Sequence, residues 1–141
     1  MRIMGLDIGE RRIGVALSDE LMLTAQGLCV LESKGVAKDI ARIGELSEKY
    51  AVTRLLLGLP RNMDGSRGPM AQKVLEFGRL LLAREPGIPV EFWDERLTTT
   101  AAQRVLLEAD VSRARRRQVV DKVAAVLILQ GYMDFISRKR G

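Results

Sequence analysis

The stretch that decides the fold is RIMGLDIGERRIGVALSD, residues 2–19. Apolar and small residues fill its first part, which predicts a buried strand over residues 2–8. Residues 9–11 favour a tight turn that begins with a glycine. The apolar residues after the turn alternate, which predicts a second strand over residues 12–19. The chain is therefore expected to open with two paired strands.

The rest of the chain predicts an α/β fold. Residues 22–32 favour a third strand, which closes an antiparallel meander, and later segments alternate between helical and strand-like patterns. The expected elements are a helix over 36–50, a strand at 55–57, a helix over 69–84, a strand over 90–93, a helix from about 98 to 108 and a helix over 118–136. This order predicts a mixed sheet in which the meander adjoins parallel strands joined by crossover helices. At 141 residues the chain fits one domain, residues 1–141.

Composition excludes several classes of function. With 47% apolar and 29% charged residues the chain is typical of globular proteins. It carries neither a signal peptide nor an apolar run of about 20 residues, so we expect a cytoplasmic protein with no membrane partner. The absence of histidine excludes Ser-His and Cys-His nucleophile pairs and His-based zinc sites. The single cysteine, Cys29, excludes an internal disulfide.

The positive charges are clustered, and the net charge is +5. One run lies at 113–117 and another at 138–140, while Arg61 and Arg67 flank a glycine-containing turn. Such clusters favour a polyanionic partner, because each cation that neutralises a phosphate releases condensed counterions. The alternative is a solvated face that keeps the protein in solution.

Three carboxylates stand where an isolated charge is costly: Asp7 at the end of the first strand, Glu95 after the last strand, and Asp121 in an apolar helical run. In sheets of this kind, ligands bind outside the carboxyl ends of the parallel strands, so Asp7 and Glu95 can share one crevice if their strands are neighbours. Small residues beside Asp121, Ala124 and Ala125, would let its helix approach the sheet. Three converging acids predict a site for divalent metal ions.

Each acid also has an explanation of its own. Asp7 can cap the turn that follows it, and Glu95 can pair with a neighbouring arginine. Asp121, placed within the first turn of the expected helix, can interact with the helix dipole. Asp94 is an alternative to Glu95 as the inward ligand.

Several motifs together resemble the YqgF/RuvX family, and they span nearly the whole chain in the family's order. The motifs are Gly5-Leu6-Asp7-Ile8-Gly9, Arg12-Ile13-Gly14-Val15-Ala16-Leu17-Ser18-Asp19, Gly58-Leu59-Pro60 with Asp64-Gly65-Ser66, Asp94-Glu95-Arg96-Leu97-Thr98-Thr99, and Asp121 with Ala124-Ala125, Ile128-Leu129-Gln130 and Tyr132.

This resemblance implies a ribonuclease H-like fold with a five-stranded mixed sheet. It also implies a hydrolase, a metal-dependent nuclease that matures the 5′ end of pre-16S ribosomal RNA during ribosome biogenesis. Carried over by motif, Asp7, Glu95 and Asp121 would be the catalytic residues and the ligands of Mg²⁺ or Mn²⁺, with two ions expected. The expected nucleic-acid contacts are Arg12, Arg61, Arg67 and Arg96.

Other functions remain open from the sequence. The same family is proposed to resolve Holliday junctions, which needs two symmetric cuts and hence a homodimer, whereas a monomer suffices for trimming RNA. A non-catalytic protein that binds ribosomal RNA, within pre-ribosomal particles, is a further alternative. The strand turn at Asp7 also resembles the phosphate-binding hairpin of actin-like ATPases, but those proteins use two such domains and this chain supplies one.

Overall fold

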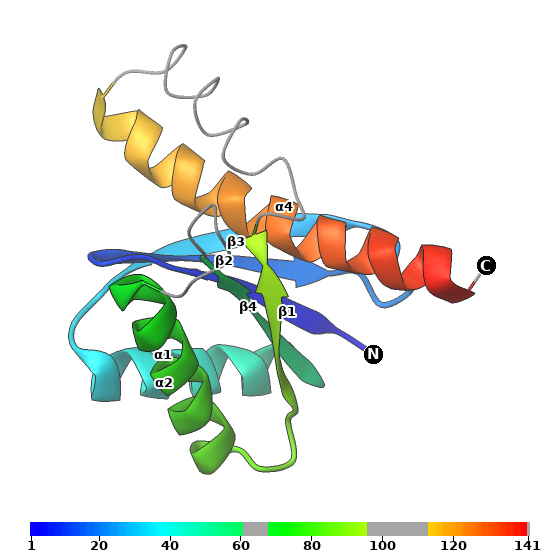
Figure 1. Ribbon diagram of the computed structural model, residues 1–141, viewed down its shortest axis with the longest axis horizontal. Helices are drawn as coiled ribbons and strands as arrows, with labels where there is room; N and C mark the ends of the chain where they lie inside the picture. The colour runs from blue at the N-terminus through cyan, green and yellow to red at the C-terminus, as the bar shows by residue number, and fades with distance from the viewer. Residues whose placement is uncertain (61–67, 96–112, 141) are drawn as a thin grey trace.

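The computed structural model describes residues 1–60, 68–95 and 113–140, and within them a five-stranded sheet lies between helices on both faces (Figure 1). The order across the sheet is β3-β2-β1-β4-β5, so β1 is central. β1 pairs antiparallel with β2 and parallel with β4, β2 pairs antiparallel with β3, and β4 pairs parallel with β5. This is the mixed sheet predicted from the sequence. The strands are β1 Ile3–Ile8, β2 Arg12–Ser18, β3 Ala25–Glu32, β4 Arg54–Leu59 and β5 Val90–Asp94.

Helices cover the two faces unequally. α1 (Val36–Lys49) and α2 (Pro69–Arg84) pack on one face, and the long α4 (Arg113–Arg140) crosses the other (Figure 1). Within the described ranges no helix combines the length and the apolar character that a bilayer crossing requires.

Alternation along β1 builds a separate core on each face of the sheet. Met4 and Leu6 belong to the cluster under α1 and α2, whereas Ile3 belongs to the cluster under α4. All three are completely buried, and each contributes about 1.5–3 kcal/mol relative to an exposed side chain. Because side chains alternate, Gly5 and Asp7 lie on the same face as Ile3, beneath α4.

The third strand begins later than the sequence predicts, at Ala25 instead of residue 22. The Asp19 carboxylate accepts hydrogen bonds from the backbone N–H groups of Leu23 (2.7 Å) and Thr24 (3.0 Å). These bonds hold a turn together, and the bond from Thr24 is the main reason that the pKa of Asp19 is lowered. The apolar residues Met22 and Leu23 were therefore wrongly assigned to the strand.

The last helix begins earlier than predicted, at Arg113 instead of residue 118. Arginine favours helices strongly, so the basic run extends the helix although it lacks an apolar face. Asp121 consequently lies more than two turns inside α4, and the explanation of Asp121 as a first-turn dipole partner is wrong. The helix expected from about 98 to 108 lies outside the described residues.

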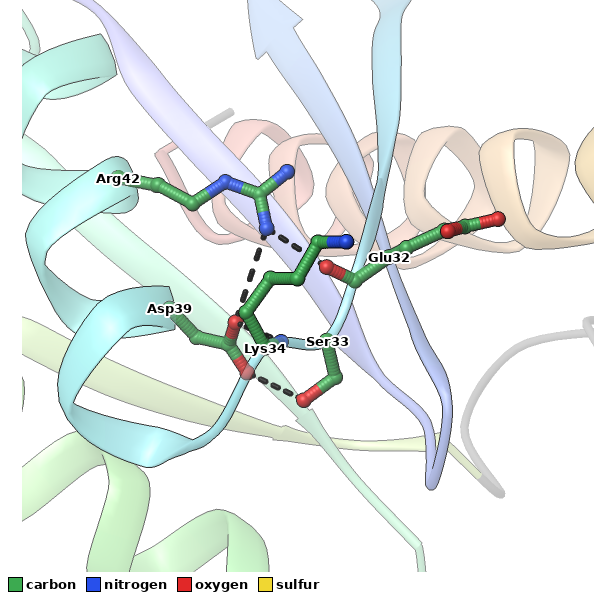
Figure 2. A network of polar contacts seen from close by, with 5 residues as sticks. All are labelled: Glu32, Ser33, Lys34, Asp39 and Arg42. Carbon is green, nitrogen blue, oxygen red and sulfur yellow. Dashed lines mark hydrogen bonds and ion pairs between the residues drawn. The ribbon is translucent and has the colours of Figure 1, made fainter.

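A buried carboxylate fixes the connection between β3 and α1 (Figure 2). Asp39, which is only 2% exposed, accepts hydrogen bonds from the Ser33 hydroxyl and from the backbone N–H of Lys34 (2.9 Å). Arg42 lies 3.7 Å from the same carboxylate and also donates to the carbonyl oxygen of Glu32. This network replaces a side-chain cap, which the N-cap residue of α1 does not supply.

Candidate active site

Asp7 lies at the carboxyl end of the central strand and is 7% exposed. Its neighbours on the same face are small: Gly5 stands two residues earlier, and Gly14 is its partner across the β1–β2 pair. Glycine has no side chain to cover the carboxylate from these directions. The strand thus presents a buried acid with open backbone around it, on the face that α4 covers.

Glu95 follows the last residue of β5 and turns back over the sheet. Its Oε1 atom lies 2.8 Å from the point that a Cβ atom on Gly58 would occupy. Leu6 pairs with Leu57, and the next residues along these two parallel strands are Asp7 and Gly58. Since neighbouring strands run about 4.8 Å apart, the Glu95 carboxylate lies above the strand adjacent to Asp7. A glycine at 58 makes this approach possible.

Asp94 belongs to the opposite face. It pairs with Leu59, which packs in the core under α1 and α2, whereas Trp93 pairs with Gly58 and packs under α4. Paired residues on parallel strands share a face. Of the two neighbouring acids that the sequence left open, Glu95 is therefore the one whose carboxylate lies on the face of Asp7.

The direction of α4 determines where Asp121 falls. Gly5 faces Leu129 and the carbonyl oxygen of Ala125, at 2.9 Å and 3.3 Å from the position of a Gly5 Cβ. Tyr132 lies further along the helix and beside Arg54, the residue paired with the start of β1. The helix therefore runs antiparallel to β1. The backbone turn that contains Asp121 precedes Ala125, on the side toward the carboxyl end of β1, and the structure describes Asp121 by its backbone alone.

The carboxyl-terminal part of α4 is fastened to the other end of the sheet. The Tyr132 hydroxyl accepts a hydrogen bond from Arg54 (3.0 Å) and donates one to Glu91 (2.6 Å). Burial, followed by the bond to Glu91, raises the pKa of Tyr132. Trp93 is buried and packs against Tyr132 and Phe135, with ring centroids 5.9 Å and 5.5 Å away. Trp93 is thus a core residue.

Carboxylate oxygens suit hard divalent cations, and Asp7 and Glu95 supply them from neighbouring strands. Among the side chains that the structure describes, no group of three Asp, Glu, Cys or His residues is close enough to hold an ion. The third expected ligand, Asp121, is not among those side chains. The open backbone at Gly58, which a Cβ would fill, fits a site built from these two acids.

Of the expected nucleic-acid contacts, Arg12 is the one that the structure describes. It opens β2 on the α4 face, two residues before Gly14, and its carbonyl oxygen accepts the N–H of Gly9 at 2.9 Å. Arg61, Arg67 and Arg96 lie outside the described residues. No sequence motif singles out Lys73, yet its ammonium group donates a hydrogen bond to the carbonyl oxygen of Gly9 at 3.2 Å.

Comparisons of sequence match nearly the whole chain to one family. The family model described as "RuvX: Holliday junction resolvase" matches residues 1–135. A protein of Moorella thermoacetica is 61% identical over 134 residues, covering 95% of each chain, and one of Symbiobacterium thermophilum is 59% identical, covering 95% of this chain and 92% of its own. A protein of Desulfitobacterium hafniense is 54% identical, covering 100% of this chain and 97% of its own. All three are named "Putative pre-16S rRNA nuclease".

Comparisons of structure find the same fold in DNA junction resolvases. RuvC of Thermus thermophilus, solved in complex with a Holliday junction substrate, superposes with a TM-score of 0.61 over 97% of each chain at 15% identity. The fowlpox virus Holliday junction resolvase superposes with a TM-score of 0.56, over 95% of this chain and 99% of its own, at 16% identity. At these identities the likeness establishes the fold, which is the predicted ribonuclease H-like α/β fold.

Proposed function

The chain belongs to the RuvX family, a family of hydrolases that act on nucleic acids, and we propose that it is a metal-dependent nuclease that cleaves phosphodiester bonds in precursor ribosomal RNA. One observation carries the proposal: the Glu95 carboxylate lies over Gly58, on the strand beside the buried Asp7 and on the same face of the sheet. Two acids at the carboxyl ends of neighbouring strands are costly for folding unless they have a common task.

Asp121 completes the proposed set of ligands from α4. It lies four residues before Ala125, which is about 6 Å along a helix, while Asp7 lies two residues beyond Gly5, which is about 7 Å along a strand. Because α4 runs antiparallel to β1 and Ala125 faces Gly5, these two steps lead in the same direction. The backbone positions thus support a third carboxylate near the first two.

In the proposed mechanism Asp7, Glu95 and Asp121 hold Mg²⁺ or Mn²⁺, with Asp7 central between the other two. Two such ions would supply an activated water and a stabilised leaving oxygen for in-line displacement at phosphorus. The protein's own contribution is to fix the positions of the carboxylates on two neighbouring strands and one helix. Arg12, Arg61, Arg67 and Arg96 bind phosphates of the substrate and orient its backbone toward the acids.

The names of the relatives support ribosomal RNA as the substrate, and with it a role in 5′-end maturation of pre-16S rRNA. Resolution of Holliday junctions is the second candidate, because the family description and the two solved resolvases name that activity. The two candidates share the catalytic acids and differ in the shape of the bound nucleic acid.

The test of the catalytic assignment uses neighbouring acids as matched variants. Glu95→Gln and Asp7→Asn should reduce Mg²⁺-dependent cutting of a precursor 16S transcript to background, with melting temperatures close to that of the wild type. Asp94→Asn removes the same charge from the adjacent residue on the other face and should retain most of the activity. Cutting that survives Asp7→Asn in nuclease-free preparations would refute the assignment, and loss in Asp94→Asn but not in Glu95→Gln would exchange the two acids.

A further inference from the structure

The turn between β1 and β2 is held by a bond of its own and by bonds from two other segments, α2 and the β3–α1 connection. Gly9 closes the turn itself, by donating its N–H to the carbonyl oxygen of Arg12. Lys73, on α2, donates from its ammonium group to the carbonyl oxygen of Gly9 at 3.2 Å. Ser33, between β3 and α1, donates its N–H to the carbonyl oxygen of Arg11 at 2.8 Å. The end of β1 that follows Asp7 is thereby joined to the helices on the α1–α2 face.

Three cations gather at this turn without carboxylate partners. Arg11 belongs to the turn, and Lys73 contacts it through the carbonyl oxygen of Gly9. Lys34 directly follows Ser33, which is bonded to Arg11. Within the described ranges, none of the three forms an ion pair, and neither does the turn's own acid, Glu10. Five arginines elsewhere, Arg2, Arg42, Arg54, Arg79 and Arg84, each lie within 4.0 Å of a carboxylate, whereas the described Lys38, Lys49, Lys122 and Arg138 resemble the three cations of the turn in forming no ion pair.

Of the three cations, Lys73 is the most informative, because of its burial and its single hydrogen bond. Its side chain is half-buried, and one of its three N–H donors is used on a neutral carbonyl oxygen. An anion that approaches a partly desolvated ammonium group stabilises its positive charge. The described part of the chain supplies no carboxylate to Lys73 for this purpose. Lys34 is similar in one respect: Figure 2 shows that Asp39 binds its backbone N–H, so its ammonium group is not used in that network.

The position of these cations relative to Asp7 indicates what the anion is. Gly9 lies two residues beyond Asp7, about 7 Å along the chain, so the Lys73 ammonium group lies within about 10 Å of the strand position of Asp7. Because α2 covers the face opposite to Asp7, this position suits a phosphate further along the substrate strand rather than the reacting phosphate. The contact with α2 lies on the face of the sheet opposite to Glu95, whereas the bond from Ser33 to Arg11 continues the β2–β3 ladder in the plane of the sheet.

We propose that Lys73, Arg11 and Lys34 form a phosphate track that leads the substrate strand over the β1–β2 turn, away from the catalytic face and onto the α1–α2 side. The direction of the strand rests on the proposed nuclease site, whereas binding to the track does not. The track recognises the phosphodiester backbone, so it accepts RNA and DNA strands alike.

Binding in an Asp7→Asn background tests the track independently of cutting. The measurement is fluorescence anisotropy with a single-stranded RNA of about 12 nucleotides, repeated at several salt concentrations. The triple variant Lys73→Met, Arg11→Met and Lys34→Met should bind more weakly, and its plot of log K against log salt should be less steep by about 2, since each single-strand contact contributes about 0.7. Lys49→Met, at an exposed lysine that ends α1, serves as the control and should change neither quantity appreciably.

Two further comparisons vary the length of the oligonucleotide and its sugar, ribose or deoxyribose. An oligonucleotide of about 3 nucleotides reaches the acids but not the track, so the triple variant should bind it as the parent does. A DNA strand of the same sequence should lose as much affinity as the RNA. An unchanged salt slope, an equal loss with the short strand, or a loss confined to RNA would overturn the track. Because Lys73→Met also frees the Gly9 carbonyl, the double variant Arg11→Met and Lys34→Met should reproduce about two thirds of the change in slope.

These outcomes separate the track from the catalytic site. A changed slope in a protein whose wild type does not cut RNA would support the track and refute the nuclease. A wild type that cuts, combined with an unchanged slope, would refute the track alone.

Discussion

At the scale of single residues, the candidate site depends on the glycines that surround its two acids. Asp7 is bordered by Gly5 and Gly14, and Glu95 reaches over Gly58. A glycine in a strand interior weakens the strand, so these positions need a compensating reason, and close approach of another group is the usual one. The sequence predicted Asp7 and Glu95 as partners, but the role of Gly58 depends on a contact between β4 and the residue after β5, which no local pattern encodes.

Gly58→Ala tests this contact. The added methyl group would lie 2.8 Å from Glu95 Oε1 and 2.5 Å from the Cδ1 atom of Ile128, so both must move. We expect a loss of stability of about 1–3 kcal/mol, as for overpacked cores, and a fall in Mg²⁺-dependent cutting of about 100-fold if the carboxylate shifts by about 1 Å. Urea unfolding and single-turnover cleavage measure the two effects. Gly87→Ala, where nothing lies within 4 Å of the new atom, should leave both unchanged. Full activity in Gly58→Ala would mean that Glu95 is not held in the position that catalysis needs.

At the scale of elements, the sequence predicted which segments form strands and which face each residue takes, because alternation and helical spacing are local. It was wrong at two boundaries: a polar contact of Asp19 delays the start of β3, and the helix propensity of the arginine run lengthens α4 beyond its apolar pattern. The choice between Asp94 and Glu95 was equally beyond local patterns. It follows from the pairing of Asp94 with Leu59 and from the packing of Phe92 against Gly78 of α2.

Close packing of α4 on β1 is the element-level condition for bringing Asp121 near Asp7. Gly5→Ala would place a Cβ atom 2.9 Å from the Cβ of Leu129 and 3.3 Å from the carbonyl oxygen of Ala125. Neither atom can swing aside, so the helix itself must move away from the sheet. We expect a stability loss of about 1–3 kcal/mol together with a large loss of cutting at saturating Mg²⁺, measured by urea unfolding and by cleavage of the precursor transcript.

Gly27→Ala is the matched control for that prediction. It adds the same atom beneath the same helix, but its close neighbours are the Cγ and Cδ atoms of Lys122, both at 2.5 Å, in a flexible and exposed side chain. The lysine can change rotamer at little cost, so stability and cutting should remain near the wild-type values. Equal effects of the two substitutions would show that the spacing of α4 from β1 does not control the site.

At the scale of the whole molecule, the two ends of the sheet differ in charge. At the end where β1 starts, Arg2 pairs with Glu20 and Arg54 with Glu91, whereas the end where β1 finishes holds the candidate acids and the unpaired cations of the phosphate track. Paired surface charges cancel at a distance, so the cations of the track attract a polyanion more strongly than these paired arginines do. This division could not be predicted from the clusters in the sequence, because Arg11, Lys34 and Lys73 are far apart along the chain and only the fold brings them to one turn.

The oligomeric state of the whole molecule distinguishes the two candidate substrates, because paired cutting of a four-way junction needs two active sites related by symmetry. A supercoiled plasmid with an extruded cruciform distinguishes single from paired cutting. One cut relaxes the plasmid, and relaxation removes the junction. Linear product therefore requires both cuts in one encounter. We expect nicked circles as the main product and slow cutting, while the precursor 16S transcript is cut at a rate per chain that does not change on dilution. Asp7→Asn supplies the background for both substrates, and sedimentation velocity at each concentration gives the oligomeric state. Linear plasmid formed as fast as the transcript is cut, by a protein that sediments as a dimer, would reverse the assignment in favour of junction resolution.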